Sequence, residues 1–130
     1  MTKKAPVSLE NESQALKEFG EYLYQLRTKR GLSLLKLGAH LGTHAGYLSQ
    51  VERGLVPPHD ELVQGIAEFF GLDENDLYEM LQIVPLSVRQ EIEQNVLLQR
   101  TLREINQSFS QKRKQELYQE FYNVFQNAKK

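Results

Sequence analysis

The sequence contains no cysteine. Disulfide bonds and cysteine-ligated zinc sites are therefore excluded, and this composition agrees with a reducing cytoplasm. No apolar run approaches the roughly 20 residues that a helix needs to cross a bilayer. The segment MTKKAPVSLENES at the start also lacks the apolar region of a secretion signal. We therefore expect a protein with no membrane partner.

Patterns typical of catalysis and of cofactor binding are also missing. The sequence has no Gly-rich phosphate-binding loop and no Ser, His and Asp residues at supporting spacing. His40 and His44 are four residues apart, but Gly42 interrupts the helix between them and no Glu-x-x-His pattern accompanies them. An RNA-binding domain of the RRM type is disfavoured because its aromatic stacking motif does not occur. We expect no enzyme, no catalytic residue, no metal ligand and no cofactor.

The composition is that of an ordinary globular protein, with 40% hydrophobic and 25% charged residues. A chain of 130 residues suits one small domain with an appendage, or one compact domain. The net charge is −1, but residues 1–82 hold 8 basic and 12 acidic residues, whereas residues 83–130 hold 8 and 5. Between residues 27 and 59 the basic side chains prevail: Arg27, Lys29, Arg30, Lys36 and Arg53 stand against Glu52 alone. Such a local positive patch can bind phosphates. The modest total charge predicts that affinity for a phosphate-bearing partner depends on a dimer, which doubles the number of charges.

The chain is organised around residues 32–54, which read LSLLKLGAHLGTHAGYLSQVERG. Apolar residues at helical spacing predict two short amphipathic helices here. They are Leu34, Leu37 and Leu41 in the first helix, and Leu48 and Val51 in the second. Gly42 offers the left-handed conformation that ends the first helix, and Thr43 offers a hydroxyl near the start of the second. Two helices joined by a short Gly-containing turn form a helix-turn-helix unit.

The second of these helices, expected over residues 44–53, turns small or polar residues outward. They are His44, Ala45, Gly46, Ser49, Gln50 and Arg53. None is acidic or bulky and aliphatic, so this face can approach an anionic groove.

Three segments carry a resemblance to a known family. They are LRTKRGLSLLKLGAHLG, then YLSQVERG, and, after a Pro-containing loop, ELVQGIAEFFGLDENDLYEML. Over residues 16–81, about half of the chain, the sequence resembles the lambda-repressor/Cro-like helix-turn-helix family, also called the Xre family. The resemblance implies an all-α fold with a five-helix DNA-binding domain, and the apolar pattern of the remaining residues predicts a C-terminal helical hairpin after it. It also implies a cytoplasmic, nucleoid-associated transcriptional regulator of bacterial or phage type, more often a repressor, that binds double-stranded DNA as a dimer.

The resemblance assigns roles to individual residues. Gln50 is the strongest candidate for a base contact, because its amide can bond N6 and N7 of adenine in the major groove. Most surface glutamines are merely solvated, and that is the alternative. Ala45 and Gly46 fall on base-reading positions, where they would meet a thymine methyl or let the backbone come close. The other expected DNA contacts are Ser33, Leu34, Lys36, Thr43, His44, Tyr47, Ser49 and Arg53.

Some of these positions depart from the family pattern. Leu34 stands where the family often has glutamine, so phosphate contact falls to the helix-start amides, to Ser33 and to the charge of Lys36. Tyr47 is expected either to pack half-buried or to reach a phosphate through its hydroxyl. Arg27 and Glu52 match a family ion pair that would join two helices and aim the reading helix; the alternative is two exposed charges of little worth.

Turn signals divide the chain into three parts. Residues 1–12 show little periodicity and are expected to be a disordered arm. Residues 13–82 are expected to form the helix-turn-helix domain, its first helix beginning at the N-cap Ser13 and ending at Gly31.

Residues 83–130 are expected to hold two helices after Pro85. The first would cover residues 88–108 behind a capping box of Ser87 and Gln90, and the second would begin at Ser110. Their apolar residues predict an oligomerisation surface: Ile92, Val96, Leu102, Ile105, Leu117, Tyr118, Phe121, Tyr122 and Phe125. We favour homodimerisation. The alternatives are an antagonist or partner protein, as in an antirepressor or toxin–antitoxin pair, and packing within one chain.

Overall fold

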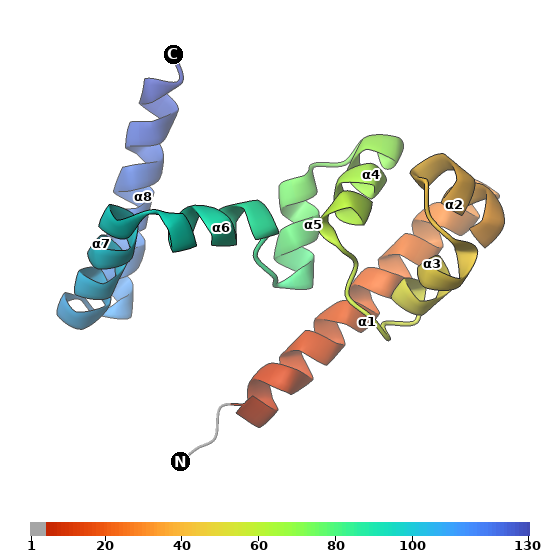
Figure 1. The fold of residues 1–130 in the computed structure, drawn as a ribbon, viewed down its shortest axis with the longest axis horizontal. Coiled ribbons are helices and arrows are strands. Elements are labelled where there is room, and N and C mark those ends of the chain that lie inside the picture. Colours follow the sequence, from red (N-terminus) through yellow and green to blue (C-terminus); the bar gives the residue numbers. More distant parts are fainter. Residues whose placement is uncertain (1–4) are drawn as a thin grey trace. The chain divides into compact units, whose positions relative to one another are not determined.

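The computed structural model describes the chain from residue 5 to residue 130, with side chains from residue 13 onward. This part is built of helices without strands (Figure 1), so the all-α class predicted from the sequence is confirmed. The chain divides into two units, residues 1–86 and residues 87–130. No helix in the described range is long and apolar enough to span a membrane.

The first helix, α1 (Ala5–Lys29), is longer than the sequence suggested. The predicted start at Ser13 is wrong, because Ser13 lies well inside the helix. Pro6 falls in the first turn, where a residue without a backbone N–H is tolerated. Residues 5–12 of the expected disordered arm are therefore helical, and its residues 1–4 lie outside the described part of the chain.

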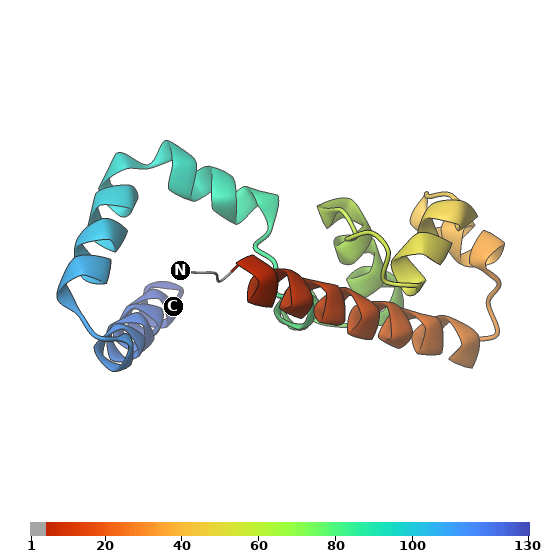
Figure 2. The ribbon, with the colours of Figure 1, turned by 90° about the horizontal axis from the view of Figure 1, so that it is seen from below.

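α1 is the helix on which the N-terminal unit is assembled, with α3 and α5 packed against it. In the view of Figure 2, α2, α3 and α4 lie along one side of α1. Gly20 makes the contact with α3 possible, because a Cβ at this position would lie 2.3 Å from the carbonyl oxygen of Glu52. Gly31 takes a left-handed φ of +70° directly after the helix, as predicted for its C-terminal stop.

The helix-turn-helix unit consists of α2 (Leu34–Leu41) and α3 (Ala45–Glu52). Ser33 is the N-cap of α2, and its hydroxyl accepts from the N–H of Lys36 at 3.1 Å. Gly42 ends α2 with φ 70° and ψ 34°, which confirms the left-handed turn. Gly38 lets the turn fold back tightly, because a Cβ there would lie 2.6 Å from the carbonyl oxygen of Thr43.

Two further helices, α4 (Asp60–Phe70) and α5 (Glu74–Leu81), close the N-terminal unit. Gly71 ends α4 in the left-handed conformation, and the Asp73 carboxylate caps α5 by accepting from the N–H of Asn75 at 2.9 Å. The helices share a core of buried apolar side chains: Phe19, Leu23, Leu37, Leu48, Val51, Leu62, Val63, Ile66, Ala67, Leu77, Tyr78 and Leu81.

The C-terminal part holds α6 (Leu86–Gln94), α7 (Val96–Ser108) and α8 (Gln111–Ala128). The single helix predicted over residues 88–108 is wrong, because Asn95 adopts an extended conformation and caps α7 through the N–H of Leu98 at 2.9 Å. Asparagine side chains compete with the helix for backbone groups in this way. Ser110 caps α8, as predicted.

The capping box predicted at Ser87 and Gln90 does not form. α6 begins at Leu86, so Ser87 lies inside the helix instead of preceding it. Pro85 stands directly before that start, where its fixed φ suits a helix entry.

Candidate nucleic-acid interface

The α3 helix divides its residues between the core and the surface. Leu48 and Val51 are buried, whereas Gly46 and Gln50 are exposed. The residues on either end of the helix, His44 and Arg53, are exposed as well. Ala45, Tyr47 and Ser49 are half-buried at the margins of this face. The residues that the sequence predicted as outward thus lie on one accessible surface, which we call the α3 face (residues 44–46, 49, 50 and 53).

A bidentate ion pair joins α1 to the C-terminal end of α3. Arg27 Nε donates to Glu52 Oε2 at 2.7 Å, and Arg27 Nη2 donates to Glu52 Oε1 at 3.0 Å. The third donor of the guanidinium, Nη1, reaches the carbonyl oxygen of Leu32 at 2.8 Å. Only 12% and 7% of the two side chains are exposed, so the alternative of two exposed charges does not hold. The hydrogen bond to Glu52 raises the pKa of Arg27, against the opposing effect of burial.

This ion pair restrains the direction of α3. Two parallel hydrogen bonds between planar groups fix orientation as well as distance. The pair lies at one end of α3, and the tight turn at Gly42 lies at the other. Because Leu48 and Val51 also anchor the inner side, the α3 face is held by its neighbours at both ends and from behind.

The start of α3 has no side-chain cap. Its N-cap is His44, where a small hydroxyl residue is usual, and the His44 side chain makes no capping hydrogen bond. Thr43 instead donates its backbone N–H to the carbonyl oxygen of Gly38 at 2.9 Å. The first N–H groups of α3 therefore lack a side-chain acceptor within the described chain.

Tyr47 binds the loop that follows α3. Its hydroxyl accepts from the N–H of His59 at 2.9 Å and lies 3.5 Å from the carbonyl oxygen of Pro57. The rings of Tyr47 and His59 are stacked, with centroids 5.1 Å apart and planes 12° from parallel. Of the two roles considered for Tyr47, the structure shows half-buried packing, with the hydroxyl engaged by the loop.

Sequence reasoning missed the part played by His59. Its Nδ1 accepts from the N–H of Leu62 at 3.1 Å and so caps α4. Histidine is not among the preferred N-cap residues. The available signal was positional, because His59 follows two prolines and directly precedes the acidic first turn of α4.

The positive patch is smaller than the sequence suggested. Arg27 is committed to Glu52, and Arg30 donates to the carbonyl oxygen of Phe69 at 3.3 Å and lies over the rings of Phe69 and Phe70. Arg30 nevertheless stays exposed, as do Lys29, Lys36 and Arg53, so Arg27 is the basic residue that the fold withdraws from the patch.

The start of α2 offers less side-chain contact than expected. The Leu34 side chain packs against the core, and Leu35 is the exposed neighbour, with 75% of its surface accessible. Ser33 and Lys36 are both exposed, although the Ser33 hydroxyl is engaged in the cap. Leu34 can therefore make the predicted phosphate contact only through its backbone.

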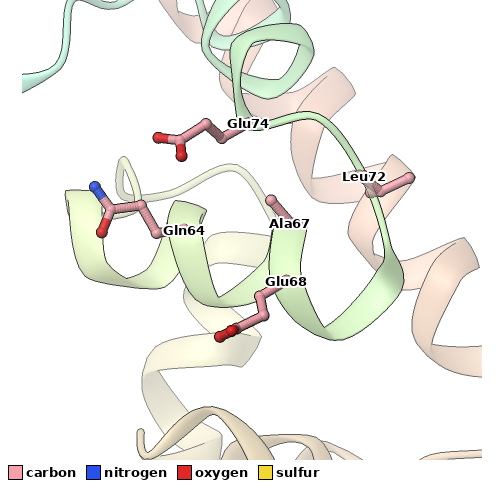
Figure 3. A pocket seen from close by; sticks show the side chains of 5 residues that line it. All are labelled: Gln64, Ala67, Glu68, Leu72 and Glu74. Atoms are coloured by element: carbon pink, nitrogen blue, oxygen red, sulfur yellow. The ribbon is translucent and has the colours of Figure 1, made fainter.

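A hollow between α4 and α5 has the wrong chemistry for a phosphate. Figure 3 shows Gln64 and Glu68 on α4 and Glu74 at the start of α5, with Ala67 and Leu72 completing the lining. Two carboxylates would repel an anionic ligand. The hollow is therefore not part of the candidate interface.

The predicted oligomerisation residues are all accessible. Ile92, Leu102, Ile105, Leu117 and Tyr118 are half-buried, while Val96, Phe121, Tyr122 and Phe125 are between 50% and 74% exposed. Seven apolar or aromatic side chains line a groove of about 590 Å³ between α7 and α8: Leu97, Leu98, Leu102, Ile105, Leu117, Tyr118 and Phe121, with Asn95 and Thr101 beside them. Leu97 and Leu98 were not among the predicted residues.

Comparison with known families agrees with this geometry. Residues 18–80 match a family model described as a helix-turn-helix domain. The match begins within α1 and ends within α5, so it covers the α3 face and its supports but not the C-terminal unit. No curated protein matches the chain. The N-terminal unit is thus a helix-turn-helix domain by sequence match as well as by structure.

Proposed function

We propose that the protein is a sequence-specific DNA-binding transcriptional regulator of the lambda-repressor/Cro-like kind, acting as a repressor, whose α3 helix enters the major groove. The observation that carries this proposal is the α3 face. Its outward residues are polar or small, and the helix is fixed at both ends and from behind. A helix so presented has the geometry of the second helix in helix-turn-helix proteins, which reads base edges.

Base reading falls to the centre of the face. The exposed amide of Gln50 can bond adenine through N6 and N7. Gly46 has open space around the position of a Cβ, so the backbone can come close to the bases. Ala45 would meet a thymine methyl. These three residues would set the preferred sequence.

Phosphate contacts surround this centre. Lys36 and Arg53 supply charge, and Ser33, Thr43, His44 and Ser49 supply polar groups to the sugar–phosphate backbone or, for His44, to a base. Contacts to phosphate hold the register of a protein on DNA but do not read sequence.

The small number of exposed cations favours a dimer. With Arg27 largely buried against Glu52 and Arg30 directed to the end of α4, each protomer brings few positive charges to the duplex. Two copies would double the phosphate contacts and would set two α3 helices about 34 Å apart on an inverted repeat. The C-terminal unit supplies apolar surface for self-association, since no residue of α6, α7 or α8 is buried.

A second candidate rests on the same C-terminal surface. In it α6–α8 bind an antagonist or a different partner protein, as in an antirepressor or toxin–antitoxin pair, and DNA binding is controlled by that partner. Sedimentation of the full chain separates the two. A dimer at micromolar concentration supports self-association, and a chain that stays monomeric until a partner is added supports the second candidate.

The direct test of the proposed function is selection of bound duplexes from random DNA at moderate salt. We expect an inverted repeat whose half-sites are one helical turn apart. Recovery of duplexes without any shared sequence would contradict the proposal. A single asymmetric half-site would keep DNA reading but remove the symmetric dimer.

A further inference from the structure

The junction between α3 and α4 is bonded in two directions by two consecutive residues. His59 faces α3, where its backbone N–H and its ring contact Tyr47. Asp60 faces the other way. Its Oδ1 accepts from the Tyr78 hydroxyl at 3.0 Å, and its Oδ2 accepts from the N–H of Leu86 at 2.8 Å. Leu86 is the last residue of the N-terminal unit and the first of α6.

The junction has little freedom to bend. Pro57 and Pro58 have a restricted φ, and Pro58 is buried. The backbone of His59 is extended, and its ring caps the helix that begins with Asp60. His59 and Asp60 are therefore consecutive residues of one restrained segment, with contacts on both sides.

Two features stabilise the hydrogen bonds that Asp60 accepts: the burial of Tyr78 and the charge of the carboxylate. Tyr78 is only 6% exposed. Burial, followed by the hydrogen bond to Asp60, raises the pKa of Tyr78 to about 12, so the phenol keeps its proton and continues to donate near neutral pH. A carboxylate that accepts two hydrogen bonds holds both donors more firmly than a neutral acceptor would.

We propose that His59 and Asp60 form a coupling element, which links the α3 helix, through Tyr47, to the residue where the chain enters the C-terminal unit. DNA on the α3 face and association of the C-terminal unit would then change each other's affinity. This inference rests on the proposed function, because it needs both DNA binding and self-association. Coupling of this kind is reciprocal, so the effect can be measured from either side.

The test uses the full chain and a short duplex with a single half-site, taken from the selected DNA. One half-site cannot bridge two protomers, and two bound duplexes repel each other, so a tighter dimer at saturating duplex must arise through the protein. Sedimentation gives the dimer dissociation constant without DNA and at saturating duplex, and the ratio of the two constants measures the coupling. We expect a ratio of about fivefold or more for the wild type.

Three variants locate the effect. Asp60→Ala removes both hydrogen bonds and should bring the ratio close to one. Tyr78→Phe removes a single hydroxyl, keeps the ring in the core, and should lower the ratio even if Asp60→Ala fails to fold. Asp76→Ala is the matched control, because it removes an exposed first-turn carboxylate of α5, and it should leave the ratio unchanged.

The possible outcomes distinguish a failure of the coupling from a failure of the proposed function. A wild-type ratio of one in a chain that binds DNA and dimerises overturns the coupling alone. So does an unchanged ratio in both Asp60→Ala and Tyr78→Phe. A wild type that shows no preference for the half-site over a scrambled duplex overturns the proposed function and the coupling with it. A wild type that reads the half-site but stays monomeric removes the homodimer and the coupling, and leaves DNA reading in place.

Discussion

The two units of this chain use similar helices in opposite ways. Among the described residues, the buried apolar side chains lie between residues 15 and 81, and α6, α7 and α8 bury none. Yet α7 and α8 carry large apolar and aromatic residues that stay at the surface. Amphipathic helices gain most of their stability by packing that face against something. The N-terminal unit thus buries its apolar side chains within itself, whereas the C-terminal unit leaves its own accessible.

The two units should differ most in the unfolding free energy that is lost when one ion pair is broken in each. Glu52→Ala leaves the guanidinium of Arg27 largely buried without its partner, and we expect a loss of about 3–5 kcal/mol in unfolding free energy. Glu116→Ala breaks the exposed pair with Arg113 in α8, where about 0–1 kcal/mol is usual. Urea unfolding of both variants measures the two losses. Equal losses would contradict the distinction between the units.

Core truncation sharpens the same comparison. Leu48→Ala removes a fully buried side chain and should cost about 2–5 kcal/mol at every protein concentration. Phe121→Ala removes a side chain that is 70% exposed. Its cost should grow with protein concentration, because the side chain is covered only in the associated form. Thermal unfolding over a hundredfold concentration range tests this, and a concentration-independent loss for Phe121→Ala would remove it from the association surface.

A pair of exposed glutamines tests the reading role. Gln50→Ala should relax the preference at one base pair by about 1–3 kcal/mol, because the contact to adenine is lost. Gln119→Ala in α8 removes an exposed glutamine whose amide donates to Asn123 Oδ1 at 3.1 Å, and it should leave the preference unchanged. Competition binding with single-base variants of the selected site gives both values. Unchanged preference in Gln50→Ala would remove this residue from the base contacts.

The smallest change in stability is expected when a single tyrosine hydroxyl is removed from each unit. Tyr78→Phe deletes the bond to Asp60 and should cost about 1 kcal/mol, whereas Tyr122→Phe on exposed α8 should cost nothing measurable. The pKa of Tyr78 is raised from 10.0 to about 12 in the folded chain, so its stabilising contribution is complete below pH 10. It is lost as the pH rises through about 12. Denaturant unfolding of wild type and Tyr78→Phe should therefore converge over that range.

Much of the N-terminal unit could be predicted because its signals are local. A glycine such as Gly42 or Gly71 needs no tertiary context to end a helix, and Ser33 caps the residues directly after it. The helix break at Asn95 was not predicted, because the apolar spacing continues unchanged on both sides of this residue. The helix is interrupted only because the Asn95 side chain competes for a backbone N–H.

The missed parts of the site are non-local. Gly20 looks like an ordinary weak point in a helix until the carbonyl groups of α3 are placed against it. The loop contacts of Tyr47, His59 and Asp60 join residues from four different segments. Spacing along the chain does not predict contacts of this kind. Arg30 likewise reads as a phosphate ligand by charge, although the fold commits it to the end of α4.

The most direct test of the account is to follow backbone amide signals by NMR while the selected duplex is added to the full chain. We predict that the largest shifts at saturation fall on residues 43–53, with Gly46 and Gln50 among them. Shifts confined to α6–α8, with the α3 face unchanged, would contradict the claim that this face is the surface that enters DNA.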